Sequence, residues 1–360
     1  MKFLAAVFCV LLALSSAIAE PLRVGIAGLT HNHVNWILGR ADRGDIIIVG
    51  IAEPNKELAK RLLDRYKLPM SLVYNSLDEM IRNTKPEAVT AFGSIYDHLS
   101  VVQTCAPLGI HVMVEKPLAV SVDHAKKMEA LAKKNNIQLI TNYETTWYAT
   151  NHKVKEMVDQ NELGQLRKMV VRDGHEGPKE IGVTPEFLDW LTDPKLNGGG
   201  AVIDFGCYGA NLITWLTHGK RPTSVMALLQ QFKPDIYPKV DDEAIIILEY
   251  PGMQGVIQAS WNWPTGRKDM EVYGATGYVY SDNRSKLRIR LKDDKAEHEE
   301  MLKDREAPLD DPFALLAGVI AKQIKLEPYD LSSLENNMIV VEILEAAIQS
   351  SKTGKKVILK

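Results

Sequence analysis

The chain has 360 residues, of which 46% are hydrophobic and 25% are charged, and its formal net charge is -3 at pH 7. A chain of this length and composition can bury the cores of two ordinary domains. The small negative charge argues against nucleic acid as a partner, because binding to phosphates requires clustered Lys and Arg.

The first 19 residues have the pattern of a signal peptide. One basic residue precedes an apolar run, and Ala17-Ile18-Ala19 forms a small-x-small cleavage site before Glu20. The apolar run is too short and too lightly flanked for a lasting membrane span. The sequence therefore predicts an exported protein that begins near Glu20, has no membrane contact after cleavage, and resides in the bacterial periplasm.

Residues 20–145 are expected to form the first domain. Short apolar segments alternate there with helical patterns, which indicates a parallel sheet covered by helices on both faces. The expected strands are 22–27, 46–52, 88–92, 111–114 and 138–141, and the expected helices include 56–66, 98–108 and 121–135, with a further helix after Ser76.

Residues 146–360 follow a different rhythm and are expected to form a second, α+β domain. Successive strand patterns separated by turns predict a large, mostly antiparallel open sheet, at 168–172, 224–232, 243–250, 255–263, 269–273, 278–281 and 287–291. One helix is expected over 201–216, and helices over 313–325 and 334–351 close the chain and are placed to pack back on the first domain. Cys105 and Cys207 lie in apolar helical patterns and are predicted to be buried free thiols.

The layout near the N-terminus is typical of a dinucleotide site. The first strand ends at Gly28, and the second ends at Glu53, where an acid can bond a ribose hydroxyl. An acid favours NAD over NADP, because it would repel a 2′-phosphate. The full G-x-G-x-x-G motif is absent, since Thr30 and His33 stand at its second and third positions. His31 and His33 also raise the possibility of a metal pair, but no third ligand is obvious, and a polar phosphate loop is the preferred interpretation.

Three segments resemble the Gfo/Idh/MocA oxidoreductases. These are VEKPLA at 114–119, GGGAVIDFGCYGANLITWL at 198–216 and EVYGATGYV at 271–279. The resemblance covers nearly the whole mature chain and implies a Rossmann domain followed by an α+β domain, whose open sheet makes a homo-oligomer. Together with the βαβ layout it implies cofactor contacts from Gly28, Thr30, His31, His33, Glu53, Ser94, His98, Glu115, Lys116 and Asn142.

The resemblance assigns the catalytic role to Lys116, Asp204 and Tyr208. In the family, the lysine of Glu-Lys-Pro holds the substrate hydroxyl beside the nicotinamide. Pro117 restricts Lys116 to an extended geometry, and a cis bond would be one way to turn the lysine inward. Histidine is commoner in the family where Tyr208 stands, and tyrosine resembles the glucose-fructose oxidoreductase branch. The proton acceptor stays open among Tyr208, Lys116, and Asp204 acting through water.

Further candidates for substrate contact surround these residues. Glu144 and Trp147 follow the last strand of the first domain, and His175 and Glu176 lie on a nearby segment. Aromatic rings stack on sugar rings, while carboxylates and imidazoles bond hydroxyl groups. We therefore expect substrate contacts from this set together with Lys116, Asp204 and Tyr208.

The resulting hypothesis is an exported NAD-dependent oxidoreductase that acts on a ring hydroxyl of a sugar or glycoside, with the 3-position favoured by resemblance. Because no nucleotide pool exists outside the cytoplasm, the cofactor is expected to be tightly bound. The alternatives are an NAD-dependent glycosidase, which oxidises its substrate transiently with Glu176 or His175 as an extra base, and a non-catalytic sugar-binding protein on the same fold.

Overall fold

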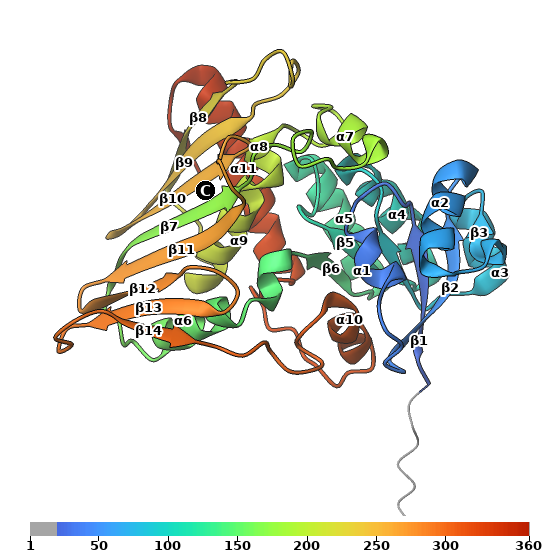
Figure 1. The fold of residues 1–360 in the computed structure, drawn as a ribbon, viewed down its shortest axis with the longest axis horizontal. Coiled ribbons are helices and arrows are strands. Elements are labelled where there is room, and N and C mark those ends of the chain that lie inside the picture. The colour runs from blue at the N-terminus through green and yellow to red at the C-terminus, as the bar shows by residue number, and fades with distance from the viewer. Residues whose placement is uncertain (1–19, 360) are drawn as a thin grey trace, which may run out of the picture.

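The computed structural model describes residues 20–359, and the predicted signal peptide lies outside this range. The described chain is built around two β-sheets of six and nine strands, with helices packed between and around them (Figure 1). None of the helices in residues 20–359 is long and apolar enough to cross a membrane.

The six-stranded sheet has the order β3-β2-β1-β4-β5-β6, and every neighbouring pair is parallel. Its central strands β1 and β4 are buried except at Arg23 and are mostly apolar, as a sheet covered on both faces requires. The predicted parallel α/β fold is therefore confirmed. The strands are β1 Leu22–Ala27, β2 Ile46–Ala52, β3 Val73–Tyr74, β4 Ala88–Ala91, β5 His111–Glu115 and β6 Leu139–Asn142.

The helices of this half begin at clear capping residues. The side chains of Asn55, Ser76 and Ser121 accept hydrogen bonds from backbone N–H groups of the first turns that follow them. The expected helix over 98–108 changes to a 3₁₀ turn at Ala106, because Pro107 has no N–H to donate. The α-helices are α1 Val34–Leu38, α2 Lys56–Tyr66, α3 Leu77–Thr84, α4 His98–Cys105 and α5 Val122–Asn135; the 3₁₀ helices are η1 Met70–Leu72, η2 Ile95–Asp97, η3 Ala106–Leu108 and η4 Glu144–Trp147.

The nine-stranded sheet has the order β14-β13-β12-β11-β7-β10-β9-β8-β15. It is mostly antiparallel, as predicted, with one parallel pair between β7 and β10 at its centre. The strands are β7 Leu166–Gly174, β8 Ser224–Gln230, β9 Glu243–Tyr250, β10 Met253–Ser260, β11 Arg267–Gly274, β12 Gly277–Ser281, β13 Lys286–Leu291, β14 His298–Met301 and β15 Val357–Ile358.

Two helix predictions in this half are wrong in detail. The helix expected over 201–216 is interrupted at Phe205, whose φ of -112° departs from helical geometry. The helix expected over 313–325 ends at Ile320, and the chain turns at Lys322 with φ of +59°. The helices are α6 Ala149–Asp159, α7 Pro185–Leu191, α8 Ala201–Asp204, α9 Gly206–Leu216, α10 Pro312–Ile320 and α11 Leu334–Thr353.

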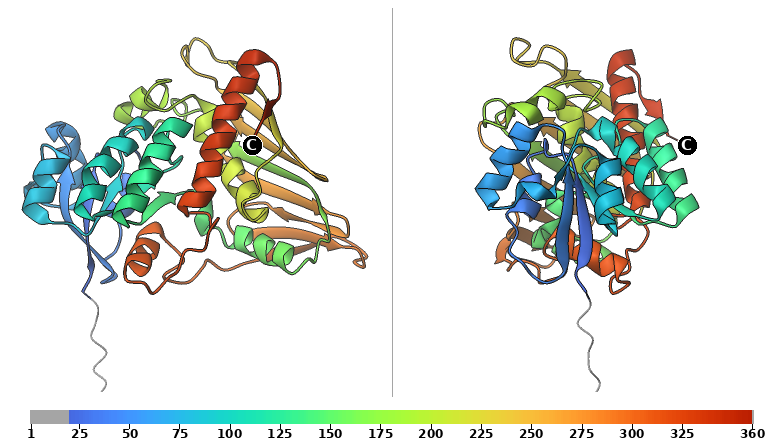
Figure 2. Two further views of the ribbon diagram at one scale, coloured as in Figure 1. Left: turned by 180° about the vertical axis from the view of Figure 1, so that it is seen from behind. Right: turned by 90° about the vertical axis from the view of Figure 1, so that its right-hand side faces the viewer.

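One face of the large sheet is covered and the other is open. Helices α9 and α11 lie against the inner face, between the two sheets (Figure 2). Helix α11 also reaches the first half, where Glu345 accepts a hydrogen bond from the backbone N–H of Val122 at 2.8 Å. Cys105 and Cys207 are buried free thiols, as predicted.

Candidate active site

The centre of the site is an ion pair between Lys116 and Asp204. Lys116 directly follows β5, and the Lys116–Pro117 peptide bond is cis. The Lys116 ammonium contacts Asp204 Oδ1 and donates to the backbone carbonyl of Asp204 at 3.0 Å. The indole N–H of Trp261 donates to Asp204 Oδ2 at 2.9 Å. Both members of the pair are buried. The ion pair therefore lies in the interior, where the two halves of the chain meet.

The two charges of this pair stabilise each other. Burial by itself would lower the pKa of Lys116, but the carboxylate of Asp204 outweighs it and raises that pKa above its usual value. Burial by itself would raise the pKa of Asp204, but Lys116 and then His175 lower it. Lys116 is therefore charged and Asp204 ionised at neutral pH.

Tyr208 lies on α9 beneath two ammonium groups. The Nζ atoms of Lys116 and Lys268 lie 5.3 and 4.9 Å from the centre of its ring. Burial raises the pKa of Tyr208 well above its ordinary value, so nearby cations do not convert it to a phenolate. This environment favours a hydrogen-bonding phenol over a base.

Lys268 and Asp173 belong to the same cluster of charged groups around Lys116, and sequence reasoning missed both. Lys268 forms an ion pair with Glu144, which also accepts from the hydroxyl of Tyr148 at 2.7 Å. Burial opposes ionisation of Glu144, but Lys268 dominates and lowers its pKa to about 2. Asp173 lies directly across from Lys268 in the pairing of β7 with β11. The one available sequence signal was the alternation of β7, which places Asp173 in step with buried residues.

His175 follows β7 and lies beside the central pair. Its ring packs edge-on against Phe205 with 4.9 Å between centroids. Its Nδ1 accepts the backbone N–H of Gly177 at 2.9 Å, so a neutral ring carries its proton on Nε2. Burial is the main cause that lowers the pKa of His175. Glu176 next to it contributes its backbone carbonyl, which accepts from Lys233 at 2.6 Å.

The loop after β1 fits a dinucleotide. Gly28 has φ of +79°, and a Cβ there would lie 2.9 Å from the backbone nitrogen of Gly93. Glu53 at the end of β2 is buried and accepts from the backbone N–H groups of Leu29 and Asn55, each at 2.9 Å. A carboxylate has about four acceptor positions, so Glu53 retains capacity for ribose hydroxyls. Burial raises its pKa.

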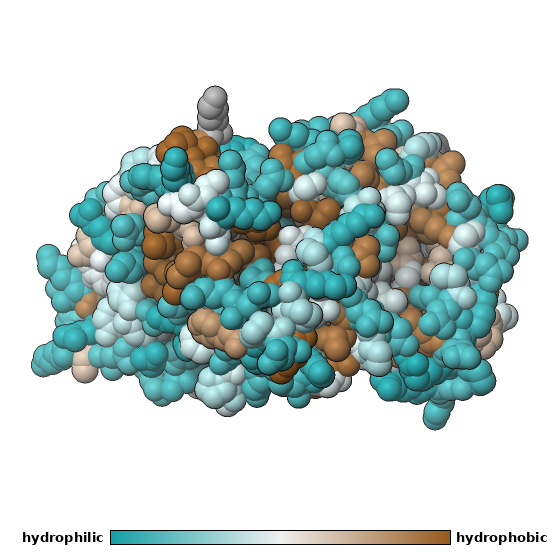
Figure 3. All heavy atoms as spheres, turned by 90° about the horizontal axis from the view of Figure 1, so that it is seen from above, coloured by the Kyte–Doolittle hydropathy of each residue, from teal (hydrophilic) through white to brown (hydrophobic). Residues whose placement is uncertain are grey.

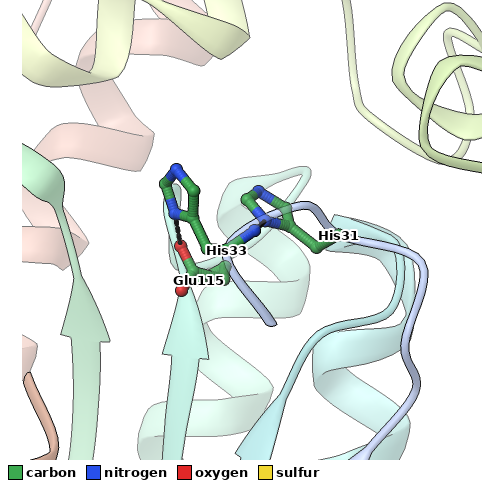
Figure 4. A group of neighbouring side chains, drawn as sticks. All are labelled: His31, His33 and Glu115. Carbon is green, nitrogen blue, oxygen red and sulfur yellow. Dashed lines mark hydrogen bonds and ion pairs between the residues drawn. The ribbon is translucent and has the colours of Figure 1, made fainter. Parts of the chain in front are cut away.

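His33, Glu115 and Asn142 form a hydrogen-bonded chain along the carboxyl ends of the strands. Glu115 accepts from His33 Nδ1 and from the Asn142 side-chain amide, each at 2.8 Å. His31 Nδ1 accepts the backbone N–H of His33 at 3.1 Å, and the remaining ring nitrogens of both histidines point away from the strand ends (Figure 4).

His31, His33 and Glu115 also lie close enough together to share a metal ion, with one potential ligand atom from each within 4.8 Å of the others. His33 Nδ1 and a carboxylate oxygen of Glu115 already bond to each other, so these two atoms have no need of a metal. Burial and then His33 and Lys116 lower the pKa of His31 well below its usual value, so the His31 ring is neutral. We therefore interpret the three residues as a hydrogen-bonded wall of the cofactor crevice.

Three other predicted site residues have structural partners. The Ser94 hydroxyl donates to Asp97 at 2.6 Å and caps η2. His98 is buried, with Nδ1 3.1 Å from the carbonyl of Leu118 and with no hydrogen-bond partner for Nε2 among residues 20–359. Burial lowers its pKa to about 4. Trp147 packs in the core around the six-stranded sheet and donates to Asn142 at 3.3 Å. Its ring is largely enclosed, although Trp147 also lines two cavities at the protein surface. Its contact with a sugar stays a prediction.

Helix α7 from the second half is joined to the loop after β1. The Trp190 indole N–H donates to Thr30 Oγ1, and the Thr184 hydroxyl donates to Asn32 Oδ1, both at 3.1 Å. Arg61 on α2 pairs with Glu186 on α7 at 2.8 Å. Figure 1 shows α7 beside the carboxyl ends of the parallel strands. These contacts fasten α7 over the edge of the crevice.

A parallel α/β sheet with a lysine–aspartate pair at its carboxyl edge, joined to an open sheet, is the architecture of a two-domain nicotinamide-dependent oxidoreductase. The chain belongs to the Gfo/Idh/MocA oxidoreductase family, which confirms the resemblance. Residues 22–143 match the family's NAD-binding Rossmann-fold model, and residues 151–280 match the model of its C-terminal domain.

Three related proteins illustrate the range of similarity. The trans-1,2-dihydrobenzene-1,2-diol dehydrogenase of Xenopus tropicalis is 26% identical over 255 residues, which cover 70% of this chain and 72% of that protein. The aldose-aldose oxidoreductase of Caulobacter crescentus has a TM-score of 0.78 and 21% identity, with 94% of this chain and 100% of that chain covered. For an inositol dehydrogenase homologue of Azotobacter vinelandii, the TM-score is 0.81, the identity 18%, and the coverage 95% and 98%. The two structural likenesses show the fold.

Proposed function

We propose that this protein is an exported, NAD-dependent oxidoreductase that oxidises or reduces a ring hydroxyl of a sugar or glycoside. The observation that carries the proposal is the buried Lys116–Asp204 ion pair at the carboxyl edge of the Rossmann sheet. That edge is where an open α/β sheet binds its cofactor and substrate. A charged lysine there can bind a hydroxyl oxygen and stabilise the negative charge that develops on it.

The proposed chemistry divides the work between cofactor and protein. When bound, the nicotinamide accepts or supplies the hydride. The Lys116 ammonium donates to the reacting oxygen. Nζ first passes one of its protons to Asp204 Oδ1, with which it is in contact. The resulting neutral amine then takes the proton that the hydroxyl loses, which restores the ammonium. Tyr208, a neutral phenol, orients the substrate rather than accepting its proton.

NAD is the proposed cofactor in preference to NADP. Glu53 stands at the ribose position, where its buried carboxyl group would oppose a 2′-phosphate. The hydrogen bonds from α7 to Thr30 and Asn32 support tight binding, because the nucleotide loop cannot open without breaking them.

A sugar or polyol is the substrate class that the relatives support. Their names specify an aldose, inositol and a dihydrodiol, all of which carry hydroxyl groups on carbon. Oxidation of the ring 3-position is the finer proposal. A glycosidase acting through transient oxidation differs in one observable: it releases free sugar without net change in NADH. The absence of Lys116 or Asp204 would favour a purely sugar-binding protein, but both residues are present and in contact.

The experiment that tests the proposal uses the mature chain purified without added nucleotide. Denaturing the protein and assaying the supernatant should release about one NAD per chain, since retention for an hour implies nanomolar or tighter affinity at typical association rates. The intact protein is then incubated with a panel of sugars and glycosides, and products are analysed by mass spectrometry. We expect a product two hydrogens lighter than its substrate. An empty protein, or a panel without such a product, would count against the proposal.

We also propose that the open face of the large sheet joins two copies of the chain. Met226 and Leu228 on β8 pair across the strands with Ile247 and Ile245 on β9, and all four side chains are exposed. Figure 3 shows that hydrophobic surface is gathered in patches, the largest over the half that contains this sheet. Exposed apolar patches of this kind are typical of protein interfaces.

Leu228→Lys should therefore shift the protein to monomer, because a lysine charge would be buried in the interface. The matched control is Leu108→Lys on the first half, since Leu108 and Leu228 are 61% and 56% exposed. Light scattering after gel filtration measures the assembly. If the wild-type protein is already monomeric, or if both variants behave alike, the sheet face is not the interface.

A further inference from the structure

A second group of polar side chains lies close to Lys116, on the inner face of the nine-stranded sheet. Asp173 on β7 and Lys268 on β11 are direct cross-strand partners. They lie in step with the buried residues Val171 and Met270 along their strands, so they share the face that packs against α9. The next residues along each strand point to the opposite, outer face, where Arg172 pairs with Asp269 and Glu271.

Asp173 is unusual among the buried polar groups. It is 1% exposed, and neither carboxyl oxygen has a hydrogen-bond partner in the described protein. The hydroxyl of Tyr143 is also buried without a partner, and its ring packs edge-on against Tyr208 at 5.5 Å. Burying a carboxyl group without hydrogen bonds is unfavourable, so such a group is normally satisfied by water or a ligand.

The charges around Asp173 are already paired. Lys116 is paired with Asp204, and Lys268 with Glu144. Each ammonium is therefore already balanced by a carboxylate, and the two pairs carry no excess positive charge to attract an anionic ligand. Placing a further charge in this buried layer would carry a desolvation cost without a compensating partner.

We propose that Asp173 is a substrate-recognition residue, whose carboxyl group bonds the hydroxyl groups of an uncharged polyol while the reacting hydroxyl lies at Lys116, and that this pocket rejects sugars carrying a carboxylate or phosphate. This inference rests on the proposed function and specifies its substrate class. Burial raises the pKa of Asp173 well above its usual value, and a neutral carboxyl group can both donate to and accept from hydroxyls.

The test compares Asp173→Ala with the wild-type protein in its NAD-bound form. Isothermal titration calorimetry measures the affinity for a neutral sugar that the wild type oxidises, for each of its monodeoxy analogues, and for the corresponding uronic acid. We expect the wild type to bind the neutral sugar at least about 100-fold more tightly than the uronic acid. Asp173→Ala should weaken binding of the neutral sugar by about 10–100-fold, yet leave binding of one monodeoxy analogue unchanged, because that analogue lacks the hydroxyl that Asp173 bonds.

The matched control is Asp269→Ala, which makes the same change on the opposite face of the sheet and should leave all affinities unchanged. Asp173→Asn preserves the side-chain volume and serves if the alanine variant fails to fold; it should lose about 10-fold in affinity for the neutral sugar. Equal weakening for every analogue, or uronic acid binding as tight as that of the neutral sugar, would overturn the inference. If the wild type oxidises the sugar but Asp173→Ala behaves like the control, only the inference fails. If the wild type binds no sugar at all, the proposed function fails with it.

Discussion

Replacing Lys116 with methionine should reduce the rate of substrate oxidation by about 10²–10⁴-fold, the usual range for loss of a group that handles the proton in the transition state. Methionine has nearly the length of lysine but no charge, so the reacting oxygen loses its donor while the surrounding packing is largely kept. The Asp204 carboxyl group loses the partner that lowers its pKa, and burial then favours its neutral form. The variant should therefore fold and retain its nucleotide.

Stopped-flow absorbance of the bound nicotinamide measures the chemical step directly, and thermal melting reports the fold. Lys127→Met is the matched control, because Lys127 is an exposed helix residue that pairs with Asp123 at 2.6 Å. Surface pairs of this kind contribute at most about 1 kcal/mol, so the control should behave like the wild type. A Lys116→Met protein that keeps more than about a tenth of the wild-type rate would show that Lys116 has no role in proton transfer.

Replacing Asp204 with asparagine should change the pH dependence of the reaction as well as its rate. In the wild type, Asp204 raises the pKa of Lys116 against the opposing effect of burial. Without the carboxylate, burial lowers that pKa, and the lysine loses its proton at a lower pH. Activity that depends on the ammonium should thus persist to alkaline pH in the wild type and disappear at a lower pH in the variant.

The free energy of unfolding of Asp204→Asn should change with pH in the direction opposite to that of the wild type. In the wild type, the folded pKa of Lys116 is above its unfolded value, so its contribution is complete below that unfolded value and is lost as pH rises through the folded pKa. In Asp204→Asn the folded pKa lies below the unfolded value of about 10.4. The unfolded chain then binds more protons, and the free energy of unfolding rises with pH between the two pKa values.

Rate profiles and thermal melts across a pH series measure both effects. Near neutral pH we expect a rate loss of at least about 10²-fold and a destabilisation of about 3–5 kcal/mol, as for other broken buried ion pairs. Asp123→Asn, which removes the acid of an exposed pair, is the control and should shift neither profile. A basic limb that stays at the wild-type pH in Asp204→Asn would show that the two residues are not electrostatically coupled.

The parallel sheet was predictable from the sequence because its signals are local. Continuous apolar runs, the caps at Asn55, Ser76 and Ser121, and the βαβ spacing from Gly28 to Glu53 each lie within a few turns of chain. Such patterns depend on side-chain periodicity and on backbone hydrogen bonding near the residue itself. The Glu-Lys-Pro segment and the glycine-rich run before Asp204 indicated the family. The family resemblance in turn predicted Lys116 and Asp204 as the central residues of the site.

The remainder of the site depends on contacts between distant segments. The ion pair between Lys268 and Glu144 joins residues 124 positions apart in the sequence, and the hydrogen bond from Trp261 to Asp204 joins residues 57 positions apart. Asp173 lies on the inner face of the sheet because β7 pairs with β11 in the register that places it opposite Lys268. A shift of that register by one residue would turn Asp173 to the outer face. The enclosure of Trp147 likewise follows from packing around the six-stranded sheet. By itself, then, the sequence determined which segments form strands and helices and which residues carry the chemistry; the register and packing of segments far apart in the chain decided which of those residues meet, because no local pattern encodes the partner across a sheet.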